Sequence, residues 1–205
     1  MLTCPRSFVS ITALLVMLMP SLAYAHVTTD MGSGFMAGLT HPLFGLDHLL
    51  AMLSVGIVST QLKNKYAIWT LPATFVCVMA IGGAIGMSGF KTGGTEVGIA
   101  LSVIILGTSI FFGSKLPPLV IYAFVAFFGM CHGYAHGAEM PEQAEAMLFA
   151  VGFMVTTATI HLAGVSIGLF STHITQGLEY LRFAGGVTAG MGVQFLLTAL
   201  GIAAA

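Results

Sequence analysis

Histidines and carboxylates at helical spacing are the side chains of this sequence that could do chemistry. The run GMCHGYAHGAEM places His132, His136 and Glu139 at positions i, i+4 and i+7, which puts all three on one face of a helix. Two imidazoles one helical turn apart are a common way to chelate a metal ion. The spacing therefore predicts a metal site on a helix that ends near residue 137.

A second group lies in the run THPLFGLDHLLAM, which contains His41, Asp47 and His48. We expect a helix to begin here, with Pro42 in its first turn and Thr40 or His41 as the cap. His41 and His48 are seven residues apart and share a face, but about 10 Å of helical rise separates them. They can bind one ion only if the chain before Pro42 folds back.

The donor types narrow the choice of metal. The three cysteines show no CxxC spacing, and imidazole with carboxylate suits Ni²⁺, Co²⁺, Zn²⁺ or Cu²⁺ better than Cu⁺ or Mg²⁺. The predicted metal ligands are His41, Asp47, His48, His132 and His136. Possible further ligands, or residues that orient the ligands, are Glu96, Glu139, His161 and His26.

These four further residues have alternative explanations. Glu96 and Glu139 would also be stable as solvated carboxylates near helix ends. His161, like His173, can be explained as a hydrogen-bond partner between helices. His26 can be explained as a residue left beside a signal-cleavage site.

The composition predicts that these residues belong to a membrane protein. Of 205 residues, 57% are apolar and 6% are charged, far below the roughly one quarter of charged residues in soluble domains. The 26 glycines fit helices that pack closely in lipid, where the backbone must satisfy its own hydrogen bonds. A net charge of −1 without any basic run argues against nucleic-acid binding. We predict an all-α integral membrane protein.

Charge-free windows mark the predicted membrane spans, each near the about 20 residues that a bilayer requires. The six spans cover residues 42–60, 66–90, 96–113, 118–137, 146–170 and 181–203. The loops between them are short, so we expect residues 26–205 to form a single transmembrane domain.

Residues 1–25 have the form of a cleavable signal peptide. Arg6 precedes an apolar run of about 12 residues, and Ala23-Tyr24-Ala25 matches the A-x-A cleavage pattern. Cleavage after Ala25 would place the mature N-terminus in the periplasm and the protein in the inner membrane of a bacterium. An uncleaved signal anchor is the alternative, although the apolar run is too short to span a bilayer.

The loop charges agree with this orientation. A periplasmic N-terminus places Lys63, Lys65, Lys115 and Arg182 on the cytoplasmic side and Lys91 on the outer side. Lys and Arg are in excess on the cytoplasmic side of membrane proteins. The signal peptide and the loop charges therefore predict the same topology.

In this topology the two groups of ligands lie at one depth. Asp47 and His48 are about 8 Å below the outer end of the first span, and His132 is at about the same depth in the fourth. A carboxylate there costs roughly 2.5–3.5 kcal/mol unless it faces polar partners, so we expect Asp47 to face the bundle interior. His41 would stand above this layer and His161 below it.

At these residues the chain resembles the HupE/UreJ family of bacterial membrane proteins. The family's HPxxGxDH pattern occurs as HPLFGLDH at residues 41–48, and HGYAHG at residues 132–137 reinforces it. The resemblance covers essentially the whole chain. It implies a secondary transporter, or permease, that supplies nickel, sometimes cobalt, to hydrogenase and urease, with the ion as substrate and no prosthetic group. The chain has no GxxxxGK[ST] motif, which fits transport without ATP hydrolysis.

Two other functions stay open from the sequence alone. A membrane-embedded zinc hydrolase would use three protein ligands and an activated water, but the sequence has no HExxH motif. A metal sensor or assembly factor would need a surface for its partner, and the short loops argue against one. We therefore expect a transporter and not an enzyme.

Overall fold

The computed structural model describes residues 34–140 and 144–203, and over these residues the protein is entirely helical. The helices are α2 (Gly34–Phe44), α3 (Leu46–Gln61), α4 (Ala67–Met87), α5 (Thr95–Phe112), α6 (Pro118–Ala138), α7 (Ala146–Ser171) and α8 (Gly177–Ala199). The predicted signal peptide and His26 lie outside the described residues.

Four of these helices, α4 to α7, are long and apolar enough to cross a membrane. Helices α2 and α3 meet the same criterion only as a pair, bent by 84° at the break between them. Helix α8 does not meet it, and carries Glu179 and Arg182 near its start. Each predicted span therefore contains a helix, and the protein is of the multi-pass membrane class. The count of six spans and the single domain of residues 26–205 stay predictions.

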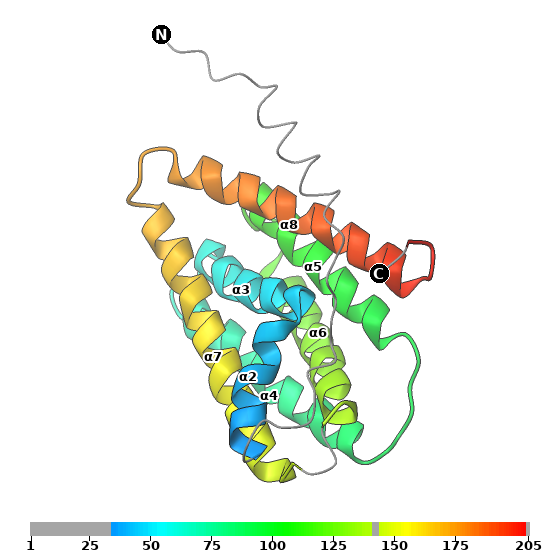
Figure 1. The fold of residues 1–205 in the computed structure, drawn as a ribbon. Coiled ribbons are helices and arrows are strands. Elements are labelled where there is room, and N and C mark those ends of the chain that lie inside the picture. Colours follow the sequence, from blue (N-terminus) through cyan, green and yellow to red (C-terminus); the bar gives the residue numbers. More distant parts are fainter. Residues whose placement is uncertain (1–33, 141–143, 204–205) are drawn as a thin grey trace.

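Helix α3 lies in the middle of the bundle, with α7 on one side and α5 and α8 on the other (Figure 1). Its residues Ala51, Met52, Val55 and Val58 are completely buried. Every residue from 54 to 59 is buried, so α3 has no face turned to the surroundings over this stretch. A helix that is enclosed on all sides in this way provides the core against which α2, α4, α5, α7 and α8 pack.

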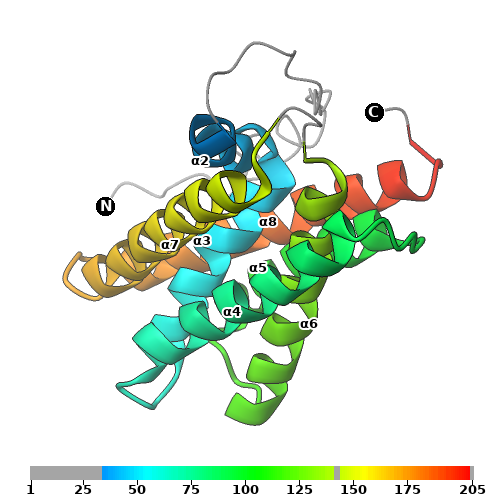
Figure 2. The same ribbon diagram turned by 90° about the horizontal axis from the view of Figure 1, so that it is seen from below.

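Two pairs of neighbouring helices run parallel. Gly129 and Gly133 of α6 touch Phe75 and Met79 of α4 in the same order, which requires α4 and α6 to point the same way. Helices α3 and α7 also run parallel and lie side by side (Figure 2). One helix separates α4 from α6 in the sequence and three separate α3 from α7. Both numbers are odd, as expected for parallel helices in a chain whose helices alternate in direction.

Helices α5 and α8 run antiparallel, because Gly185 of α8 meets Phe111 and Gly192 meets Ile104. The joints that carry Lys63 and Lys115 therefore lie at one end of the bundle, together with the start of α8. The opposite end holds the start of α5 and the end of α6. The end that carries these lysines is the one that the sequence predicts to be cytoplasmic.

The start of the first predicted span differs from the expectation of one straight helix. Pro42 lies near the end of α2, not in a first turn, and the Thr40 hydroxyl donates to the carbonyl oxygen of Met36 (3.0 Å) instead of capping. The helix breaks at Gly45, whose backbone is extended (φ −88°, ψ 108°). Proline lacks the N–H that continues a helix, and glycine destabilises a helix interior. Pro42 and Gly45 together therefore explain the break.

Candidate metal site

The bend between α2 and α3 brings His41 and His48 against the same neighbour. His41 lies in the last turn of α2 and its ring centroid is 4.8 Å from that of His136. His48 lies in the first turn of α3, and its ring centroid is 4.3 Å from that of His136. The chain therefore folds back at Gly45, after Pro42 and not before it. This bend meets the condition under which the two histidines can share one ion.

Helix α6 supplies the other two imidazoles from one face. His132 lies one turn before His136, and its ring centroid is 4.9 Å from that of His48. His132 is 0% exposed and His136 is 4% exposed. These four rings form a continuous group, which we call the histidine cluster: His41, His48, His132 and His136.

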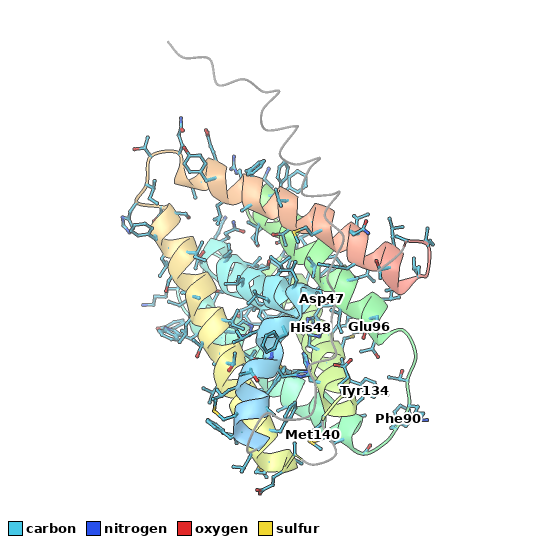
Figure 3. All side chains as sticks on the ribbon, in the orientation of Figure 1. Asp47, His48, Phe90, Glu96, Tyr134 and Met140 are labelled. Carbon is cyan, nitrogen blue, oxygen red and sulfur yellow. The ribbon has the colours of Figure 1, made fainter. Side chains whose placement is uncertain are left out.

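Asp47 fixes the orientation of His48 at the bend (Figure 3). Oδ1 of Asp47 accepts the backbone N–H of His48 at 2.9 Å and lies 2.8 Å from Nδ1 of the same residue. A carboxylate only accepts, so Nδ1 of His48 carries the proton and Nε2 keeps its lone pair. Asp47 also lies in the first turn of α3, where the helix dipole favours a negative charge.

His132 has the same tautomer for a different reason. Its Nδ1 lies 2.8 Å from the backbone oxygen of Phe128, and a carbonyl oxygen can only accept, so Nδ1 donates. The Nε2 atoms of His48 and His132 are buried and have no hydrogen-bond partner among the described residues. Unpaired buried polar atoms are rare in proteins, and an unprotonated Nε2 oriented by a bond at Nδ1 is the usual arrangement of a histidine metal ligand.

The outer edge of the cluster contains a second type of donor. Ligand atoms of His41, His136 and Glu139 all lie within 4.8 Å of one another, and His41 Nε2 is 3.6 Å from Glu139 Oε2. The Glu139 side chain is 47% exposed, so this group of three opens to the surroundings. On its other side the rings of Phe149 and Phe153 contact the histidines.

Glu96 lies near the same end of the bundle, on the first turn of α5 (Figure 3). The segment before α5 is held by Tyr134 of α6, whose Oη donates to the backbone oxygen of Phe90 (2.6 Å) and accepts the N–H of Thr92 (2.8 Å). Tyr134 therefore fixes the start of the helix that carries Glu96.

The glycines of HGYAHG bring α6 close to α4. A Cβ atom at Gly133 would lie 1.9 Å from the backbone oxygen of Met79, and one at Gly137 would lie 2.2 Å from that of Gly83. Only glycine permits this approach of two backbones. Each glycine directly follows a histidine of the cluster, so the close contact sets the position of both imidazoles.

Two of the remaining histidines lie away from the cluster. His161 of α7 is buried, and its ring contacts Phe75, at 5.1 Å between centroids. His173 is exposed just beyond the end of α7, at the opposite end of the bundle from Glu139. The histidine cluster thus contains the histidines of the two sequence motifs, and it contains neither His161 nor His173.

Comparison with known proteins agrees with the motifs at the cluster. The family model described as HupE / UreJ protein matches residues 14–195. The chain belongs to the HupE/UreJ family. Protein HupE of Rhizobium leguminosarum bv. viciae is 39% identical over 187 residues, which are 91% of this chain and 96% of that protein. No solved structure matches the chain.

The histidines of the two HupE/UreJ motifs lie together in the structure, but no motif marks the aromatic residues around them. Phe75, Phe149 and Phe153 contact histidines of the cluster, and Tyr134 holds the loop before Glu96. None of them could be identified from the sequence, because single aromatic residues are common in apolar helices and their contacts depend on helix packing. The assignment of the cluster and Asp47 as metal ligands stays a prediction.

Proposed function

We propose that this protein is a secondary transporter that imports a divalent transition metal, Ni²⁺ or Co²⁺, across the bacterial inner membrane. The ion is the substrate, and neither a prosthetic group nor an enzymatic reaction is part of the proposal. Membership of the HupE/UreJ family supports it, as does the absence of a nucleotide-binding motif from the sequence.

The observation that carries the proposal is the histidine cluster itself. Four imidazoles from three helices contact one another inside an apolar bundle, and the buried Nε2 atoms of His48 and His132 have no partner among the described residues. Neutral imidazole is a good ligand for Ni²⁺ and Co²⁺. A bound cation would satisfy these nitrogens.

The exposed carboxylates provide the entrance. Glu139 and Glu96 lie at the same end of the bundle as His41, and their negative charges attract a hydrated cation before it reaches the cluster. His41 and His136 can then take it from Glu139, since the ligand atoms of all three are within 4.8 Å. His48 and His132 replace further water molecules deeper in the bundle.

Asp47 acts through His48 in this proposal. Its carboxylate holds the proton on Nδ1, which leaves Nε2 free to bind the ion, and its negative charge offsets part of the charge of a divalent cation. Asp47 was predicted from the sequence as a direct ligand. The short contact with His48 favours the orienting role.

The proposed topology follows the sequence. Residues 1–25 are removed as a signal peptide, residues 26–205 cross the membrane six times, and the mature N-terminus is periplasmic. The entrance at Glu139 then faces the periplasm and the lysine-bearing joints face the cytoplasm, in agreement with the positive-inside rule.

Uptake of radioactive nickel by cells tests the proposal. The host should lack other nickel importers, and the membrane content of each variant should be matched by immunoblot. We expect the double variant His48→Ala, His132→Ala to lose uptake by about tenfold or more, because it removes the two oriented ligands. His173→Ala changes an exposed histidine away from the cluster and should transport like the unchanged protein.

Equal uptake by the double variant and the unchanged protein would contradict the proposal. The purified protein, reconstituted in liposomes, tests the alternative of a membrane-embedded zinc hydrolase. A transporter accumulates nickel in the liposomes, whereas a zinc hydrolase would turn over a lipid or peptide ester without accumulating the metal.

A further inference from the structure

A fifth imidazole is buried deeper in the bundle than the histidine cluster. His161 of α7 is 1% exposed, and neither of its ring nitrogens has a hydrogen-bond partner among the described residues. The explanation of His161 as a hydrogen-bond partner between helices therefore finds no support in these contacts. A buried neutral imidazole without partners has one N–H and one nitrogen lone pair unsatisfied, and a cation could use the lone pair.

One aromatic ring connects this histidine with the cluster. Phe75 of α4 contacts the ring of His132 at 5.3 Å and the ring of His161 at 5.1 Å between centroids. Phe75 is completely buried. A series of ring contacts thus begins beside the exposed Glu139 and leads into the bundle, in the order His136, His48, His132, Phe75 and His161.

Further weak donors lie on the same two helices. Thr157 is one turn before His161 on α7, and Met79 is one turn after Phe75 on α4. The Thr157 hydroxyl donates to the Met79 sulfur at 3.9 Å, and both side chains are buried. An imidazole with a hydroxyl and a thioether nearby binds a divalent ion less tightly than four imidazoles and a carboxylate. Such weaker binding lets the ion leave again, as onward movement requires.

The backbone at His161 is held firmly against the central helix. A Cβ atom at Gly56 of α3 would lie 2.2 Å from the backbone oxygen of His161, and one at Gly164 would lie 2.2 Å from that of Leu53. This close packing of α3 on α7 fixes the height of His161 relative to His48, which is on the same helix as Gly56.

We propose that His161 is an inner binding station for the transported divalent cation, which reaches it from the histidine cluster past the ring of Phe75. This inference rests on the proposed transport function and extends it. The ion is bound first by the four imidazoles of the cluster and then by His161, and movement of the Phe75 ring opens the way between the two.

Separating binding from transport tests this station. In His161→Leu and His161→Gln, the cluster is unchanged, so the purified protein in detergent should bind Co²⁺ with the same visible absorption spectrum as the unchanged protein. Nickel uptake by cells should fall by about tenfold or more, as for loss of a ligand. Gln keeps the polarity of the position and Leu keeps its volume. If one variant fails to fold, the other still tests the inference.

Two outcomes would overturn the inference. If either folded variant took up nickel at the level of the unchanged protein, transport would not require His161. The double variant of His48 and His132 would still test the proposed function separately. If the His161 variants lost both Co²⁺ binding and nickel uptake, His161 would instead be a structural support of the cluster.

A cysteine at the station reports directly on the ion. In a background with Cys77→Ala and Cys131→Ala, His161→Cys loaded with Co²⁺ should show a thiolate-to-cobalt charge-transfer band in the near ultraviolet. Ala158→Cys, at an exposed position of the same helix, is the matched control and should show none. Absence of the band at position 161 in protein that still binds Co²⁺ would overturn the proposal.

Discussion

At the scale of single residues, the direction of each imidazole decides whether it can bind a cation. His48 and His132 each donate from Nδ1, one to a carboxylate and the other to a backbone oxygen. Both histidines therefore have an unprotonated Nε2 that can bind a cation. The two bonds differ in one respect, because Asp47 adds a negative charge and the carbonyl of Phe128 does not.

This difference predicts the effect of Asp47→Asn. The amide removes the charge and can donate to Nδ1 of His48 as well as accept from it, so it no longer fixes one tautomer. We expect the affinity of the purified protein for Co²⁺ to fall by about 10- to 100-fold, the usual range for a residue that orients a metal-bound histidine. Titration of Co²⁺ absorption in detergent measures it.

The matched control is Glu179→Gln, which removes an exposed carboxylate at the start of α8. It should bind Co²⁺ like the unchanged protein. If Asp47→Asn bound as tightly as this control, Asp47 would not set the orientation of His48.

At the scale of helices, two features position the cluster: the bend at Gly45 and the close contact of α4 with α6. The bend turns the last residues of α2 back toward α6. It also creates a helix start inside the bundle, next to Asp47. Broken helices of this kind are tolerated in membrane proteins where they line a polar site.

The contact of α4 with α6 predicts a contrast between two glycines. Gly133→Ala introduces a Cβ atom 1.9 Å from the backbone oxygen of Met79, whereas at Gly83 the nearest atom would be 3.6 Å away. We expect Gly133→Ala to destabilise the protein by about 1–3 kcal/mol, as in other overpacked interiors. Gly83→Ala should leave stability unchanged or raise it slightly, because alanine is the better helix former.

Thermal unfolding of the purified proteins in detergent compares these variants. Gly133→Ala should unfold at a lower temperature and lose nickel uptake, since α6 must move away and carry His132 with it. Equal unfolding temperatures for the two variants would mean that the HGYAHG glycines do not set the helix contact.

The helices were predictable from the sequence to a greater extent than the site. Charge-free windows in an apolar chain locate helices well, since few charges can enter a membrane. The bend at Gly45 was not predicted, because it falls inside one apolar run and depends on how α2 packs against α7. His132 and His136 were predicted from their helical spacing and His48 from its depth in the first span, but the approach of His41 requires the bend.

At the scale of the whole molecule, alternating helix directions give the bundle two chemically different ends. One end carries Lys63 and Lys115, and the other carries Glu96 and Glu139 beside the histidine cluster. The acidic end attracts cations and the basic end is the one expected in the cytoplasm. This polarity places the proposed entrance for the cation on the periplasmic side.

Labelling of single cysteines tests the orientation. In a background without Cys77 and Cys131, we expect Met140→Cys, next to Glu139, to react with a membrane-impermeant maleimide in intact spheroplasts. Lys115→Cys, in the exposed joint before α6, should react only after lysis. The reverse pattern would place the acidic entrance in the cytoplasm and contradict an import function.

X-ray absorption spectroscopy of Ni²⁺ bound to the purified protein shows which atoms coordinate the ion, and so whether the histidine cluster binds the transported cation. We expect nitrogen and oxygen ligands without sulfur and the multiple-scattering pattern of imidazole rings, and His48→Ala with His132→Ala should reduce this pattern strongly. A spectrum without imidazole scattering, or one that the double variant leaves unchanged, would mean that the cluster does not bind the cation.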